Sequence, residues 1–116
     1  MFALNFTSPL NEKLLITRRK SATIRLGDIR ETYPDNSIVW ITFGNKYEKK
    51  RKLYEAMIDK AFTKKFCELT TSELAHQNPE ITTVEELISN FQEVYDKQIY
   101  ADDTVTIIHF SEVVSE

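Results

Sequence analysis

The sequence predicts a single α+β domain, residues 1–116, in which a curled β-sheet packs against helices at one side. Three observations support this fold class. The 116 residues fit one domain, and 41% of them are apolar. Segments 38–43 and 104–110 are rich in β-branched and aromatic residues, which is typical of strands, and the first is apolar enough to be buried on both faces or to line a small barrel. Residues 83–95 instead carry apolar residues at helical spacing throughout.

The chain begins with a predicted strand, helix and strand. Residues 2–6 predict a short strand. Ser8 and Pro9 then mark a helix start, because Ser can cap a helix and Pro is tolerated at its first position. We expect this helix to end near Thr17.

Residues 21–26 predict the second strand, in which side chains alternate between two faces. One face is apolar, and we expect it to face the core: Ala22, Ile24 and Leu26. The other face is expected to be exposed, although it carries Ser21, Thr23 and Arg25 just after Lys20. Turn signals follow at Gly27-Asp28 and at 33–37.

The second half of the chain contains one ambiguous segment. Residues 51–69 fit a helical stripe, yet Phe62, Lys64 and Phe66 are spaced as in a strand. Residues 83–95 form the clearest helix, because Thr82 and Thr83 each precede a Glu by three positions in a capping-box pattern. Residues 104–110 predict the last strand, and Asp102-Asp103 the turn before it.

Composition excludes several classes of function. The net charge of −3 excludes a basic coat of the kind found in non-specific DNA-binding proteins, so any nucleic-acid site must be local. A single cysteine, Cys67, allows no intrachain disulfide and no cysteine-based zinc site, and we expect it in the core. No signal peptide or membrane span is apparent, so we expect a cytoplasmic protein. We also expect that it needs no metal or other cofactor.

The run Arg19-Lys20-Ser21-Ala22-Thr23-Ile24-Arg25 resembles the signature of ASCH domains, whose fold is similar to that of PUA domains. The segment Phe66-Cys67-Glu68-Leu69-Thr70 resembles a second family stretch, which follows a long strand. The resemblance implies a small mixed β-barrel flanked by helices, with a cleft between the barrel and the first helix. It also implies that residues 51–66 form a strand despite their helical pattern.

The sequence departs from the family at two positions. Arg18 stands where members usually have Gly, two residues before the lysine. Pro34-Asp35-Asn36 stands where they usually have Pro-Gly-Asp. Asp tolerates left-handed backbone better than most residues, so we expect this turn to be retained.

One branch of the family hydrolyses N4-acetylcytidine, and its working Lys, Thr and Glu correspond here to Lys20, Thr23 and Glu80. A Thr hydroxyl beside a neutral Lys amine is a workable pair of nucleophile and base, and Glu80 would protonate the leaving amine. Burial and a nearby cation such as Arg25 would both lower the pKa of Lys20. The candidates for substrate binding are Arg19, Ser21 and Arg25.

Two interpretations stay open. The chain is either an amidohydrolase acting on an acylated nucleoside or a non-catalytic module that binds RNA. A ribonuclease is less favoured, because no histidine pair or metal cluster is evident. The basic run from Lys46 to Lys52, with Tyr47, is favoured as a solvated hairpin tip over a phosphate-contacting loop. His76 and His109 are interpreted as structural or surface residues.

Overall fold

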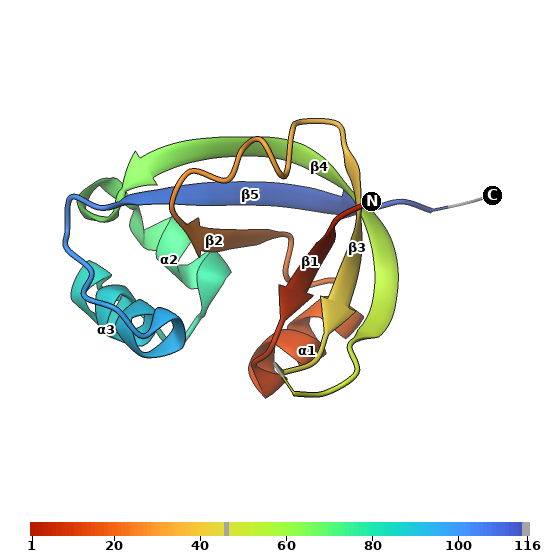
Figure 1. Ribbon diagram of the computed structural model, residues 1–116, viewed down its shortest axis with the longest axis horizontal. Coiled ribbons are helices and arrows are strands. Elements are labelled where there is room, and N and C mark those ends of the chain that lie inside the picture. Colours follow the sequence, from red (N-terminus) through yellow and green to blue (C-terminus); the bar gives the residue numbers. More distant parts are fainter. Residues whose placement is uncertain (46, 115–116) are drawn as a thin grey trace.

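The computed structural model describes residues 1–45 and 47–114. Its five strands form one mixed sheet in the order β1-β3-β4-β5-β2, which curls into a half-barrel (Figure 1). Strands β1 and β3 are parallel, and the other neighbours are antiparallel. The predicted α+β class is confirmed. The strands are β1 (Ala3–Phe6), β2 (Ala22–Leu26), β3 (Ile38–Phe43), β4 (Arg51–Lys65) and β5 (Thr104–Glu112). The helices are α1 (Pro9–Ile16), α2 (Thr71–Gln77), α3 (Val84–Tyr95) and a 3₁₀ turn, η1 (Phe66–Glu68).

The ambiguous segment is strand β4, which confirms the assignment implied by the family resemblance. Residues 51–57 pair with β3, and the part from Ala56 onward pairs with β5 as far as Lys65. The register shifts between Ile58 and Lys60, which lets one long strand curl around the half-barrel. Pairing on two sides outweighs the helical propensity of this segment.

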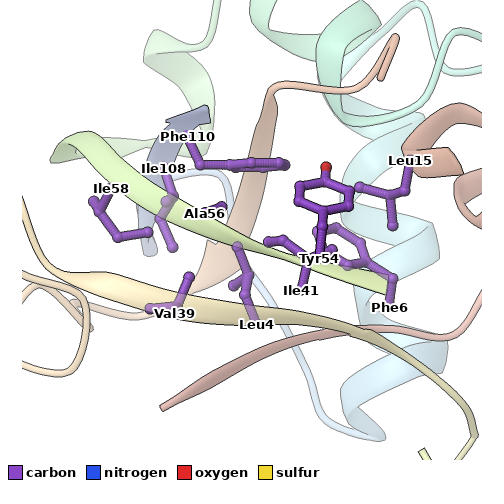
Figure 2. Packing of buried hydrophobic residues seen from close by; sticks show 10 residues of the cluster. All are labelled: Leu4, Phe6, Leu15, Val39, Ile41, Tyr54, Ala56, Ile58, Ile108 and Phe110. Carbon is purple, nitrogen blue, oxygen red and sulfur yellow. The ribbon is translucent and has the colours of Figure 1, made fainter. Parts of the chain in front are cut away.

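Two hydrophobic clusters lie on opposite faces of β5. Side chains Ile108 and Phe110 join the first cluster, whereas Val105 and Ile107 join the second. Figure 2 shows the first cluster: Leu4, Phe6, Leu15, Val39, Ile41, Tyr54, Ala56, Ile58, Ile108 and Phe110. The second lies toward α2 and α3: Ile24, Phe66, Leu69, Leu74, Ile81, Leu87, Phe91, Ile99, Val105 and Ile107. Burial on both faces explains why the consecutive residues Ile107 and Ile108 of β5 are both apolar.

The remaining local predictions have mixed outcomes. Helix α3 begins after Thr83, whose hydroxyl accepts from the Glu86 backbone N–H at 3.2 Å, as predicted. The turn at 34–36 is retained, but its left-handed residue is Asn36, with φ of 69°. Helix α2 was not predicted, although Thr70 and Glu73 form a capping box at its start. The prediction that Cys67 lies in the core was wrong, because its side chain on η1 is exposed.

Candidate functional site

Strand β2 is buried on both faces, which corrects the expectation that one face is exposed. Ala22 and Ile24 are buried as predicted. Thr23 is only 2% exposed, because its face of β2 lies beside Ile108 of β5 in the first cluster. Lys20, just before the strand, is 4% exposed. Lys20 and Thr23 therefore belong to the interior, whereas Arg25 is partly buried and Ser21 is exposed as expected.

The C-terminal end of α2 packs against this buried segment. The Lys20 ammonium donates to the carbonyl oxygens of His76, at 2.7 Å, and Gln77, at 2.9 Å. The Thr23 hydroxyl donates to Oε1 of Gln77 at 2.9 Å, and the Ile24 backbone N–H donates to the same oxygen at 2.7 Å. Sequence reasoning missed Gln77. The capping pattern at 70–73 would have placed it at a helix end, but its contact with β2 is tertiary.

Side chains also cover the outer edge of β2. This strand is at one end of the sheet, so its outward N–H groups have no neighbouring strand. The Ile24 N–H is bonded to Gln77, and the Leu26 N–H donates to the Tyr95 hydroxyl at 3.2 Å. Helices α2 and α3 thus satisfy an edge that would otherwise need water.

Arg25 connects the two edge strands of the half-barrel. Its Nη2 donates to the carbonyl oxygen of Asn5 in β1 at 2.8 Å, and its guanidinium carbon lies 4.8 Å from the centre of the Phe6 ring. Its Nε is buried and has no hydrogen-bond partner within the described residues. We call the junction formed by Asn5, Phe6, Lys20, Thr23, Arg25 and Gln77 the seam.

The seam contains two cations and no carboxylate partner for them in the described part of the chain. Lys20 Nζ lies 5.8 Å from the centre of the same Phe6 ring that Arg25 contacts. Burial, followed by the nearby charge of Arg25, lowers the pKa of Lys20 to about 7. This agrees with the sequence-based expectation for Lys20. The carbonyl oxygens of His76 and Gln77 favour the charged form and oppose the shift.

The other predicted site residues are exposed and do not belong to the seam. Glu80 is exposed, and its carboxylate makes no hydrogen bond or ion pair within residues 1–45 and 47–114. Its backbone N–H donates to Oδ1 of Asn78 at 2.9 Å. Arg19 and Ser21 are exposed. The structure therefore brings Lys20, Thr23 and Arg25 together but leaves Glu80 out of contact with them.

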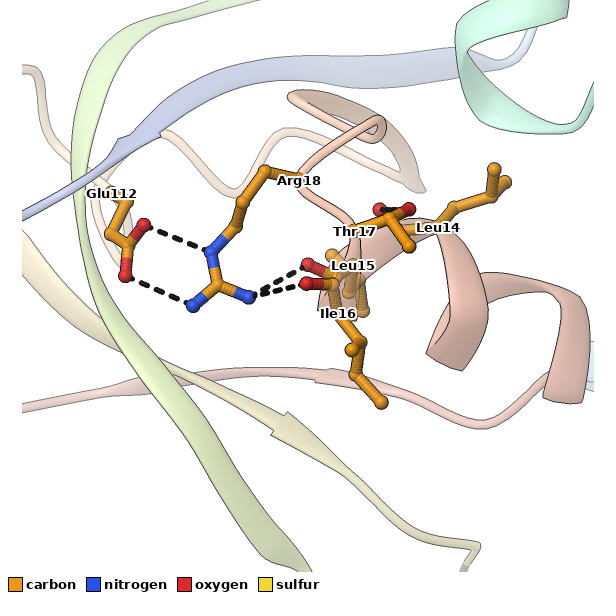
Figure 3. Close-up of polar contacts among 6 residues, drawn as sticks. All are labelled: Leu14, Leu15, Ile16, Thr17, Arg18 and Glu112. Atoms are coloured by element: carbon orange, nitrogen blue, oxygen red, sulfur yellow. Dashed lines mark hydrogen bonds and ion pairs between the residues drawn. The ribbon is translucent and has the colours of Figure 1, made fainter.

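A cavity of about 220 Å³ lies next to Lys20, where α1 leads into β2 and meets β4 and β5. It is lined by Arg18, Lys20, Ser21, Tyr54, Phe110, Ser111 and Glu112. Arg18 binds both carboxylate oxygens of Glu112, at 2.9 and 3.0 Å (Figure 3). Its Nη1 donates to the carbonyl oxygens of Leu15 and Ile16 at the end of α1.

The backbone of Arg18 has a φ of 59°. Glycine adopts this left-handed conformation freely, which accounts for the usual Gly at this family position. In this chain, Arg18 adopts this unfavourable backbone conformation, and its guanidinium makes the hydrogen bonds to Glu112, Leu15 and Ile16 described above.

The remaining candidates are engaged in other contacts or exposed. In the basic run, Lys46 lies outside the described residues, Arg51 pairs with Glu12, and Lys52 lies 3.4 Å from the centre of the Trp40 ring. Lys49 and Lys50 are exposed in the β3–β4 connection, in keeping with a solvated hairpin. His76 is exposed, and His109 stacks on Phe62 with ring centres 5.9 Å apart.

Neither a metal cluster nor a membrane span occurs in the part of the chain that the structure describes. There, no group of three or more His, Cys, Asp or Glu side chains is arranged to hold a metal ion. None of its helices combines the length and apolar composition needed to cross a membrane.

No family model and no curated protein matches the sequence. Solved structures resemble the chain instead. The ASCH domain from Lactobacillus crispatus JV V101 matches with a TM-score of 0.64 at 10% identity, covering 95% of this chain and 77% of that one. The chain has the ASCH-domain fold. Its curled sheet and flanking helices confirm the predicted PUA-like architecture.

Two further structures share the ASCH fold of this chain. Protein EF3133 from Enterococcus faecalis V583, of the family DUF984, matches with a TM-score of 0.72 at 19% identity, covering 97% of this chain and 76% of that one. Hypothetical protein PH0355 matches with a TM-score of 0.65 at 16% identity, covering 97% and 98%. At these identities the similarity concerns the fold.

Proposed function

We propose that the chain binds RNA or a modified nucleoside at the seam. The observation that carries this proposal is the presence of two cations, the buried Lys20 and the partly buried Arg25, that make no ion pair with a carboxylate in the described residues. Burying a charge costs free energy unless a partner compensates it. A phosphate or another oxygen-rich group supplies such a partner, and a guanidinium binds it particularly well.

Arg25 is the residue best placed to contact the ligand directly. Its only hydrogen bond in the described structure is the one from Nη2 to Asn5, and its Nε is buried without a partner. Lys20 contributes positive electrostatic potential from its buried position, since its ammonium is hydrogen-bonded to carbonyl oxygens at the C-terminal end of α2. The exposed Arg19 and Ser21 lie next to Lys20 in sequence and would contact the rest of the ligand.

Hydrolysis of the acyl amide of N4-acetylcytidine is the second candidate. A specific observation favours it: with a pKa of about 7, a large fraction of Lys20 is neutral near neutral pH and can act as a base toward Thr23. Two observations favour binding over hydrolysis. The Thr23 hydroxyl donates to Gln77, and Glu80 is exposed and out of contact with both residues. Catalysis would require α2 and the segment after it to rearrange.

The experiment compares RNA and nucleoside binding by the wild type, Lys20→Met and Arg25→Met at two salt concentrations. Lys97→Met is the matched control, because Lys97 is exposed after α3. We expect salt-sensitive binding that falls about tenfold in both seam variants and is unchanged in the control. Circular dichroism of each variant verifies the fold. Absence of any RNA or nucleoside binding by the wild type at low salt would overturn the proposal.

A parallel assay measures acetate release from N4-acetylcytidine by the wild type, Lys20→Ala, Thr23→Ala and Glu80→Ala. Turnover that is lost in the Lys20 and Thr23 variants, while their folds stay intact, would establish hydrolysis. RNA binding without turnover would assign the chain as a binding module.

A further inference from the structure

We propose that the cavity lined by Arg18, Ser21, Tyr54, Phe110 and Glu112 holds one unstacked nucleobase of the ligand bound at the seam. The inference deepens the proposed function and rests on it. It adds a separate base pocket, which would give the chain a preference among bases. Because Arg18 stands where family members usually have Gly, a cavity bounded by this residue is not implied by the family resemblance.

The size and position of the cavity fit one base. Its volume of about 220 Å³ lies below the range of ~300–1,000 Å³ that is typical of sites for drug-sized ligands. Lys20 lines the cavity and also belongs to the seam. A nucleotide could therefore place its phosphate at the seam and its base in the cavity.

Two aromatic rings form part of the cavity wall, which is otherwise polar. Tyr54 of β4 and Phe110 of β5 both line it, and Figure 2 shows their side chains next to each other in the first cluster. Proteins that recognise unpaired RNA bases usually stack them on aromatic rings.

Two hydroxyl groups at the cavity lack partners within the described residues. Tyr54 is only 7% exposed, yet its hydroxyl makes no hydrogen bond there. The hydroxyl oxygen itself is reached by solvent, so it is open to a ligand in the cavity. Burial raises the pKa of Tyr54, so its hydroxyl stays protonated at neutral pH and can donate. The Ser21 hydroxyl is likewise unbonded within the described residues.

Arg18 and Glu112 form a charged rim. The guanidinium carbon of Arg18 lies 4.0 Å from the centre of the Tyr54 ring, and the pair is partly exposed, at 42% and 34% of the two side chains. A base entering the cavity would meet a guanidinium, a carboxylate and two hydroxyls around its edge. These groups provide both donors and acceptors, which is what discrimination among bases requires.

The test is an NMR titration of the wild type with each of the four ribonucleoside 5′-monophosphates, repeated with Tyr54→Phe. This substitution removes one hydroxyl and leaves the ring. The matched control is Tyr100→Phe, at an exposed tyrosine after α3. We expect one nucleotide to bind best and to perturb the signals of Tyr54 and Phe110. Tyr54→Phe should weaken its binding about fivefold, the loss expected for one hydrogen bond, and the control should have no effect.

The outcomes separate this inference from the proposed function. Binding that perturbs Lys20 and Arg25 but neither Tyr54 nor Phe110 would overturn the base pocket and leave the seam in place. Equal binding of all four nucleotides, unchanged in Tyr54→Phe, would do the same. Absence of both RNA and nucleotide binding would overturn both proposals.

Discussion

The surroundings of Lys20 disfavour the charged form of its side-chain amine. Its side chain is 4% exposed, and its pKa is lowered from 10.5 to about 7 by burial and then by Arg25. In the unfolded chain the amine returns to its ordinary pKa. Between pH 7 and pH 10.5 the unfolded state therefore binds more protons than the folded state at this position.

The stability of the fold should consequently rise with pH above 7. The contribution of Lys20 to the free energy of unfolding should increase by up to about 1.4 kcal/mol per pH unit until the pH approaches the unfolded pKa. The carbonyl oxygens of His76 and Gln77 favour the ammonium and therefore narrow the pH range over which this increase occurs. Urea denaturation from pH 6 to pH 9 measures it. Lys20→Met should lack this component, and parallel pH profiles for the two proteins would contradict the prediction.

The residue scale also shows what the sequence could not predict. Alternation along 21–26 correctly placed Ala22 and Ile24 toward a core. It could not show that Thr23 and Lys20 are buried as well, because their burial depends on α2, which is distant in sequence and was not predicted. Glu80 was aligned through a loop, and its position in the structure does not support contact with Thr23.

At the scale of elements, α2 is short but determines the environment of β2. Its last residue, Gln77, offers one amide oxygen to both the Thr23 hydroxyl and the Ile24 backbone N–H. The N-terminal end of α2 is fixed by the capping box of Thr70 and Glu73. The helix therefore holds the edge strand through its last residue and depends on its first turn to stay in place.

Replacing Gln77 should loosen this edge. Gln77→Ala leaves a buried hydroxyl and a backbone N–H without their acceptor, and we expect a loss of about 1–3 kcal/mol in the free energy of unfolding. Hydrogen exchange of the Ile24 amide should become at least about tenfold faster. The control is Gln98→Ala, an exposed glutamine after α3. An Ile24 amide that is equally protected in both variants would contradict the role of Gln77.

The elements differ in how far the sequence predicts them. Helix α3 was predictable because its periodicity and its caps agree. Strand β4 was not predictable from periodicity, since its Lys and Glu content favours a helix and only pairing with β3 and β5 decides the outcome. Helix α2 was missed because its seven residues are too few to show a clear apolar stripe.

At the scale of the whole molecule, the two hydrophobic clusters share β5 and should unfold together. Both depend on that strand, with alternate side chains contributing to each. The single tryptophan, Trp40, lies on β3 between Val39 and Ile41 of the first cluster, whereas α2 and α3 contribute to the second. Tryptophan fluorescence therefore reports on β3, and helical circular dichroism reports mainly on the second cluster, because α2 and α3 together are longer than α1.

A substitution in the second cluster should shift both signals equally. Leu87 is fully buried in α3, and Leu87→Ala should cost about 2–5 kcal/mol. We expect the urea midpoints from fluorescence and from circular dichroism to fall by the same amount. If the circular dichroism midpoint fell while the Trp40 signal kept its wild-type midpoint, the two clusters would be independent.

The hydrogen bond from Arg25 to Asn5 links β2 to β1 through a side chain, whereas the other neighbouring strands are joined by backbone hydrogen bonds. Elsewhere the wall is a ladder of backbone hydrogen bonds, but between β1 and β2 a single guanidinium spans the gap. A side-chain link can exchange one acceptor for another without unfolding a strand. An anion that engages Arg25 would compete with the Asn5 carbonyl, so the width of the opening would follow the ligand. If the proposed ligand binds at the seam, the same side chain would serve both ligand binding and closure of the half-barrel.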